Sequence, residues 1–215
     1  MYMPSSAREE RRDVLIAAMR DIQFAALVSS GPEGLHASHL PVLLREESDD
    51  LLIEVHVAKG NPHWKLAGAP TLAIFQGPQA YIHPGWYESK KEHGRVVPTW
   101  TYIAVHAHGS IEVFDAQEEL LDHVGRLTSQ NEEKRAEPWA VTDAPEKYLD
   151  AMTRAIVGIR MRVERIEGSW KLNQHKSDAD RAGVVSGLAA EERAGAQAIS
   201  AQMQALEAAR PAGER

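Results

Sequence analysis

The feature that most constrains the fold is a succession of short strand-like segments separated by glycine, proline and acidic turns. Phe24–Ser29 and Leu35–Leu44 flank a turn at Gly31–Gly34, and Leu51–Val57 follows an acidic turn at 46–50. Apolar, β-branched segments of this length bounded by turn residues are typical of β-strands. Strands joined by such short connections pair in antiparallel fashion, so this part of the chain predicts an antiparallel meander.

The strand pattern continues to the last quarter of the chain. We expect strands at 71–75, 80–82, 100–114 and 156–166, with Gly77-Pro78 between the first two and a loop at 84–97. In the last of these strands apolar residues alternate with charged ones, which indicates one solvated face. Helices are expected at 7–21 with Ser5 or Ser6 as N-cap, 62–66 with Asn61 as N-cap, 115–130, 145–153, 177–185 and 189–209. The sum predicts a mainly β (α+β) protein, a small antiparallel barrel with peripheral helices.

The chain length suits one substantial domain. We expect that domain, with its N-terminal helix, to span residues 1–188 and to be followed by an alanine-rich helical tail at 189–215. No apolar segment approaches the length of a membrane span and the N-terminus has no signal-peptide pattern, so we expect a cytoplasmic protein without a membrane partner. The chain contains no cysteine, which excludes disulfides, thiolate nucleophiles and cysteine-based metal sites.

Polar and aromatic residues gather at five places on or beside the expected strands. The first two are His36–Pro41, where His36 and Ser38 share a strand face, and His56–Lys65, where two lysines flank a helix start suited to phosphate. Taken alone, a strand histidine bonded to backbone and an ordinary capped helix explain these residues equally well.

The other three groups are Phe75–Tyr87, Val97–His108 and Lys171–Ser177. Aromatic rings with a nearby glutamine amide can stack on and hydrogen-bond a planar heterocycle, although aromatic residues in strands are more often core. The late segment is rich in donors suited to phosphate or carbonyl oxygens, and a solvated loop is the simpler reading. No Walker loop, dinucleotide fingerprint, nucleophile elbow or His-Glu-x-x-His motif is present, and no metal site is expected.

These segments together resemble one known family. At them the chain is similar to the PaiB-type FMN-binding negative transcriptional regulators, from Met1 to about Leu188. The motifs that carry the resemblance are Met1–Pro4, His39–Pro41, Asn61–Trp64, Phe75–Pro78 with Ala80–Ile82, Pro84 with Trp86-Tyr87, Val97–Trp100, Ala104–His106, Ile156–Gly158, and Lys171-Leu172 with Gln174.

The resemblance implies an FMN-binding split β-barrel that works as a homodimer, with the flavin at the subunit interface. It suggests phosphate contacts at Lys59, Asn61 and Lys65. It also suggests a ring site built from Ser38, Phe75, Gln76, Thr99, Trp100 and Tyr102, with Lys171 and Gln174 reaching across from the partner subunit. No catalytic residue is assigned.

Three functions remain open at this point. The resemblance implies repression of transcription, and therefore DNA as a partner, although the net charge is -7 and the segment 176–215 has no visible basic patch. An FMN-dependent oxidoreductase of the split-barrel type is the alternative. A haem-binding split barrel, using one of the strand histidines, is the third.

Overall fold

The computed structural model describes residues 1–48 and 50–209. These residues form two compact units. The first unit contains residues 1–15, 76–105 and 167–209, and the second unit contains residues 16–48, 50–75 and 106–166. Three long strands, β6 (Pro70–Ile82), β7 (Thr99–Phe114) and β8 (Ile156–Lys171), contribute residues to both units.

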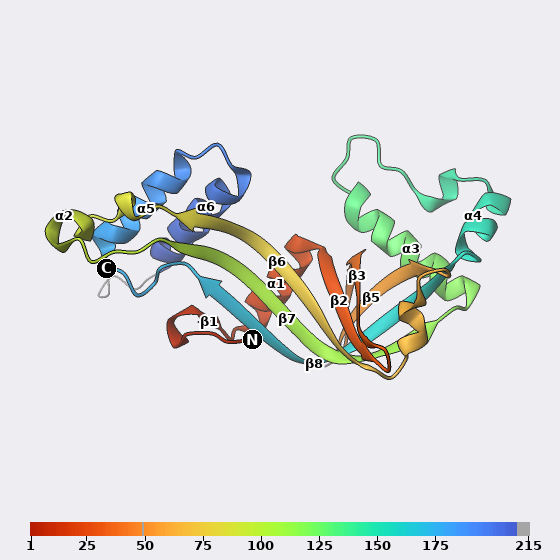
Figure 1. The fold of residues 1–215 in the computed structure, drawn as a ribbon. Coiled ribbons are helices and arrows are strands. Elements are labelled where there is room, and N and C mark those ends of the chain that lie inside the picture. The colour runs from red at the N-terminus through yellow and green to blue at the C-terminus, as the bar shows by residue number, and fades with distance from the viewer. Residues whose placement is uncertain (49, 210–215) are drawn as a thin grey trace. The chain divides into compact units, whose positions relative to one another are not determined.

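Within residues 1–48 and 50–209, eight strands form one sheet, and Figure 1 shows their course. They are β1 (Arg8–Glu9), β2 (Phe24–Gly31), β3 (Gly34–Pro41), β4 (Leu43–Glu47), β5 (Asp50–Ala58), β6 (Pro70–Ile82), β7 (Thr99–Phe114) and β8 (Ile156–Lys171). The order is β3-β2-β6-β7-β8-β5-β4, and β1 pairs with β8 off this path. The β1–β8, β2–β3, β2–β6, β4–β5 and β5–β8 pairs are antiparallel. The predicted class, a mainly antiparallel split barrel with peripheral helices, is confirmed.

The helices lie between and after the strands. The α-helices are α1 (Arg12–Ile22), α2 (Ser89–His93), α3 (Gln117–Glu132), α4 (Glu146–Thr153), α5 (Asp178–Ala189) and α6 (Ala194–Ala208). The short 3-10 helices are η1 (Ser5–Ala7), η2 (Pro62–Leu66), η3 (Pro84–Trp86) and η4 (Val141–Asp143). None of the helices in the part of the chain described here combines the length and apolar composition needed to cross a membrane.

The core of the second unit is built from alternating strand residues. Leu27, Val55 and Ile159 are almost fully buried. Burial alternates along β2, as expected when one sheet face is covered, whereas Leu51–Val55 of β5 are buried on both faces. The backbone of Gly109 in β7 approaches β8 so closely that a Cβ there would lie 2.0 Å from the carbonyl oxygen of Arg162. Glycine is therefore required at this position.

The core of the first unit lies between strands and the two C-terminal helices. Ile82, Ile103, Leu188, Ile199 and Met203 are buried in one cluster. Helices α5 and α6 pack against each other (Figure 1). Ser177 caps α5 as predicted, because its Oγ accepts a hydrogen bond from the Asp180 amide at 3.2 Å.

The N-terminal helix begins later than predicted. Helix α1 starts at Arg12 and not near Ala7, because Arg8 and Glu9 pair with Ser169 and Gly168 of β8. Strand pairing has overridden the local helix pattern here.

Two strand boundaries also differ from the prediction. The expected strand 35–44 is interrupted at Val42, whose amide donates to the carbonyl of Gln23 at 2.8 Å and whose carbonyl accepts from Gln130 at 3.2 Å. The expected strands 71–75 and 80–82 are one strand, β6. Its buried positions change from odd to even numbers around Gly77-Pro78, so this dipeptide shifts the face and does not end the strand.

The packing of α6 gives a stability prediction. Ile199 has no exposed surface, so Ile199→Ala should lower the free energy of unfolding by about 2–5 kcal/mol, measured by urea denaturation. Gln202→Ala, at an exposed position of the same helix, should change it by less than about 0.5 kcal/mol. Equal stability of the two variants would show that α6 does not pack on this core.

Candidate functional site

A buried chain of polar side chains surrounds His63 in the second unit. Asn61 is the N-cap of η2, as predicted, and its Oδ1 accepts a hydrogen bond from the His63 amide at 3.0 Å. Pro62 at the first helical position suits this start, because it needs no amide hydrogen there. The local sequence thereby directs the His63 ring into the interior, where it has no exposed surface.

Both ring nitrogens of His63 are hydrogen-bonded. Nδ1 lies 2.9 Å from Ser38 Oγ, and Nε2 lies 2.8 Å from Ser29 Oγ. Ser29 Oγ lies 2.6 Å from Thr71 Oγ1, which donates to the carbonyl of Ala69 at 3.1 Å.

The direction of each hydrogen bond follows from counting donors. Thr71 has one hydroxyl hydrogen and gives it to a carbonyl, so Ser29 must donate to Thr71 and accept from Nε2 of His63. A neutral His63 then accepts at Nδ1, so the Ser38 hydroxyl donates to it. Ser38 Oγ accepts in turn from Asn61 Nδ2 at 3.0 Å.

His63 is held in its neutral form. Burial, followed by the nearby His36 ring, lowers the pKa of His63 to about 4. The two rings meet edge to face with centroids 4.8 Å apart. The donor and acceptor pattern of the chain is therefore fixed at neutral pH.

A groove of about 510 Å³ lies beside this chain. It is lined by Gly31, Pro32, Glu33, Gly34, Leu35, His36, Pro62, Lys65 and Leu66. Lys65 is exposed, and its ammonium group lies 5.6 Å from the centroid of the Trp64 ring. Lys59 is also exposed, and its carbonyl accepts a hydrogen bond from the Trp64 indole at 3.2 Å. Neither lysine has a carboxylate partner among the described residues.

A second group of predicted residues lies in the first unit. Lys171 Nζ donates to Thr99 Oγ1 at 3.1 Å and lies 5.8 Å from the centroid of the Tyr102 ring. Trp100 is half exposed, and its ring meets that of Tyr81 edge to face at 6.3 Å. These side chains offer a cation, a hydroxyl and exposed aromatic surface.

The remaining predicted residues have other surroundings. Gln174 is engaged with the local backbone, accepting from the Leu172 amide at 2.8 Å and donating to the Trp170 carbonyl. Gln76 is exposed, whereas Phe75 has no exposed surface and fills the core of the second unit. Of the eleven predicted residues, the structure joins Ser38 with Asn61 and Thr99 with Lys171 by hydrogen bonds.

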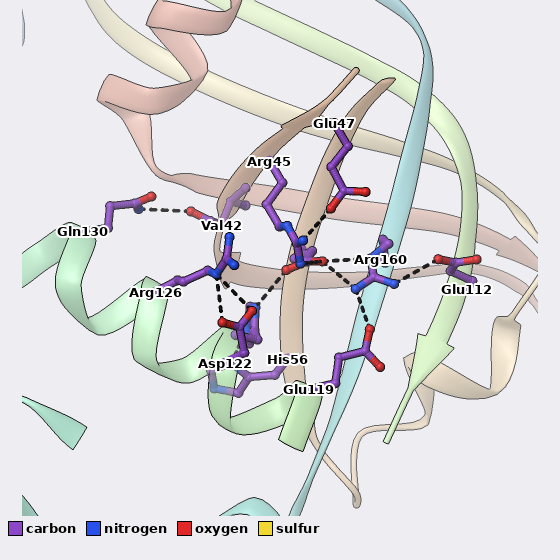
Figure 2. Close-up of polar contacts among 12 residues, drawn as sticks. Val42, Arg45, Glu47, His56, Glu112, Glu119, Asp122, Arg126, Gln130 and Arg160 are labelled. Atoms are coloured by element: carbon purple, nitrogen blue, oxygen red, sulfur yellow. Dashed lines mark hydrogen bonds and ion pairs between the residues drawn. The ribbon is translucent and has the colours of Figure 1, made fainter. Parts of the chain in front are cut away.

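The second unit also contains a buried ionic network (Figure 2). Glu54 in β5 has no exposed surface, and its Oε1 accepts hydrogen bonds from Arg160 at 2.7 Å and Arg45 at 3.2 Å. Arg160 also donates to Glu119 of α3 at 2.7 Å and to Glu112 of β7 at 3.3 Å. This network connects α3 to the four strands β4, β5, β7 and β8.

Two histidines extend the network. His123 Nδ1 lies 3.6 Å from Glu54 Oε2, and neither atom has a hydrogen-bond partner. His123 Nε2 lies 3.0 Å from His56 Nδ1, and burial, then His123, lowers the pKa of His56 to about 4. Burial alone would raise the pKa of Glu54, but the facing His123 and Arg160, together with the charge of Arg45, lower it to about 2.

The sequence analysis missed Ser29, Thr71 and Glu54. Each stands at a position where its strand is buried, and a polar residue at such a position must find a partner inside the protein. A polar residue in phase with an apolar strand face is the signal that could have identified them.

Comparison with known proteins agrees with the fold and with the motifs found in the sequence. The order of strands defines an antiparallel split barrel, and a family model described as "Putative FMN-binding domain" matches residues 1–165. The chain belongs to this family.

Two relatives are similar to this chain in sequence, and one solved structure shares its fold. Protease synthase and sporulation protein PAI 2 of Bacillus subtilis is 29% identical over 206 residues, covering 95% of this chain and 97% of the relative. An uncharacterized protein of Emericella nidulans is 32% identical, with 87% of this chain and 90% of the relative covered. The FAD and heme binding protein of Mycobacterium smegmatis shares the fold at a TM-score of 0.56 and 18% identity, covering 82% of this chain and 79% of that chain.

Because of the two buried networks, we expect the folded protein to lose stability as the pH falls. His56 and His63 have pKa values near 4 in the folded chain and near 6.5 when unfolded, so the unfolded chain binds more protons as pH falls from 6.5 to 4. The free energy of unfolding should fall across this window, and Glu54 should add a further loss between pH 4.5 and 2. His56→Gln should reduce the loss between pH 6.5 and 4 by an amount on the order of 2 kcal/mol, measured by urea denaturation at several pH values.

The exposed His39 provides the control. His39→Gln should retain the whole loss between pH 6.5 and 4. A His56→Gln profile parallel to that of the unsubstituted protein would contradict the assignment of the loss to His56.

Proposed function

We propose that this protein binds FMN and holds its phosphate group in the second unit with Lys59, Asn61 and Lys65. The observation that carries the proposal is the exposed Lys65 in the lining of a groove beside a fixed polar chain, with the exposed Lys59 two residues before Asn61. Neither lysine is matched by a carboxylate among the described residues. Family membership supplies the cofactor class.

The residues present fit a phosphate group. Two ammonium groups can offset its charge, and the positions of Asn61 and Ser38 are fixed by hydrogen bonds before any ligand arrives. Preorganised polar groups lose little conformational freedom on binding, which favours affinity.

The flavin ring requires a planar, partly apolar surface. We propose that Trp100, Tyr102, Thr99 and Lys171 provide it in a homodimer, with Gln76, Gln174 and Ser38 as further contacts. The half-exposed Trp100 and the Lys171–Thr99 hydrogen bond support this part of the proposal. When bound, the flavin would supply one- or two-electron chemistry, and the chain's own residues would bind and orient it.

The phosphate site is tested by an FMN titration. The double substitution Lys59→Ala/Lys65→Ala should weaken FMN binding at least about tenfold, or about 1.4 kcal/mol, because both cations are lost. The exposed pair Lys134→Ala/Lys147→Ala removes the same charge elsewhere and should leave the affinity within about twofold. Equal losses in both double variants would show that only net charge matters and that this site is wrong.

We propose further that the flavin-bound dimer represses transcription. The name of the Bacillus subtilis relative refers to sporulation, and that relative aligns with almost the whole chain. The FMN-loaded protein should retard a promoter fragment from its own genome, but not a scrambled fragment, at physiological salt. Rapid bleaching of the flavin by reduced nicotinamide with no retardation would instead indicate an oxidoreductase.

A further inference from the structure

The net formal charge of the groove beside η2 depends on the protonation state of His36. The ionisable side chains that line it are Glu33, His36 and Lys65. Glu33 and Lys65 cancel each other, so the lining is neutral when His36 is neutral and carries one positive charge when His36 is protonated. Neither Glu33 nor Lys65 has an ion-pair partner within residues 1–48 and 50–209.

The buried chain fixes which nitrogen of His36 carries hydrogen. Asn61 presents Oδ1 to the His63 amide and Nδ2 to Ser38, so its orientation is set. His36 Nε2 lies 3.2 Å from the same Oδ1, an acceptor, and must therefore carry a hydrogen. Nδ1 is then a bare lone pair in the neutral ring, which repels an anion, and an N–H donor in the protonated ring.

We propose that the groove binds a phosphate group and that His36 contacts it as an imidazolium, so that binding takes up a proton. This inference rests on the proposed FMN function, whose phosphate it places, and adds a contact that the sequence analysis did not assign. His36 is a binding residue here, and Asn61 is the residue that positions it.

Charged side chains of both signs line the groove beside His36. Glu33, in the turn before β3, and Lys65 of η2 line the groove together with His36 and carry opposite charges. His63, also in η2, is neutral and packs edge to face on the ring. A phosphate dianion added to this set shifts the balance towards the protonated ring, because it places negative charge beside it.

The test measures affinity against pH with three ligands. FMN, riboflavin and inorganic phosphate are titrated between pH 6 and pH 8, phosphate by competition with FMN. FMN should bind roughly tenfold more tightly at pH 6 than at pH 8, because an imidazolium offers the phosphate a positive charge and an N–H at Nδ1, whereas a neutral ring offers neither. Riboflavin, which lacks the phosphate, should show no such change.

Two substitutions separate His36 from its neighbours. His36→Gln should abolish the tighter binding at pH 6, since Gln cannot gain a charge, while His39→Gln on the opposite strand face should retain it. The phosphate group itself loses a proton near pH 6, which strengthens binding as pH rises, and this contribution is common to both variants.

Proton uptake gives a second readout that needs no substitution. Isothermal titration of FMN into the unsubstituted protein at pH 7.5, in two buffers of different ionisation enthalpy, should show uptake of up to one proton. His36→Gln should show none. The inference is supported if the unsubstituted protein takes up a proton on binding FMN and the His36→Gln protein does not.

The outcomes distinguish the inference from the function on which it rests. If no flavin binds to any form of the protein, the proposed function fails. If FMN binds with the same pH profile and proton uptake with and without His36, the function stands and the inference is overturned. If inorganic phosphate competes more strongly at pH 6 only when His36 is present, the phosphate group itself is the ligand recognised.

Discussion

The ion pairs that offset the buried charge of Glu54 are the interaction on which the second unit depends most. A carboxylate without exposed surface in the middle of a strand is costly unless it is paired. Arg160 and Arg45 pair with one of its oxygens, and Arg160 also reaches Glu119 and Glu112. Removing one partner of such a buried pair typically costs about 3–5 kcal/mol, so the strands and α3 are held in one arrangement.

The same requirement for pairing shapes the candidate site. Ser29, Ser38, Thr71 and His63 are all buried, and each finds a hydrogen-bond partner within the chain that begins at Asn61. Because the carbonyl of Ala69 can only accept, it sets the direction of every following bond. The His63 amide sets the orientation of Asn61, and the Asn61 Oδ1 in turn determines which nitrogen of His36 carries hydrogen.

The two units carry different parts of the proposed chemistry. The second unit combines fixed polar groups with two exposed lysines, which suits an anion. The first unit presents exposed aromatic surface and a lysine held by a threonine hydroxyl, which suits a planar ring.

The sequence by itself determined the class of fold, the family and most strand and helix positions, because these depend on local periodicity, turn residues and short motifs. The Asn61 and Ser177 caps were predicted for the same reason. Only the tertiary structure decided where helix α1 begins, where the strand breaks at Val42, and how β6 changes its buried face. It alone joined Ser29, Ser38, His63 and Thr71, since hydrogen bonds between side chains far apart in sequence depend on strand register, which no local pattern encodes.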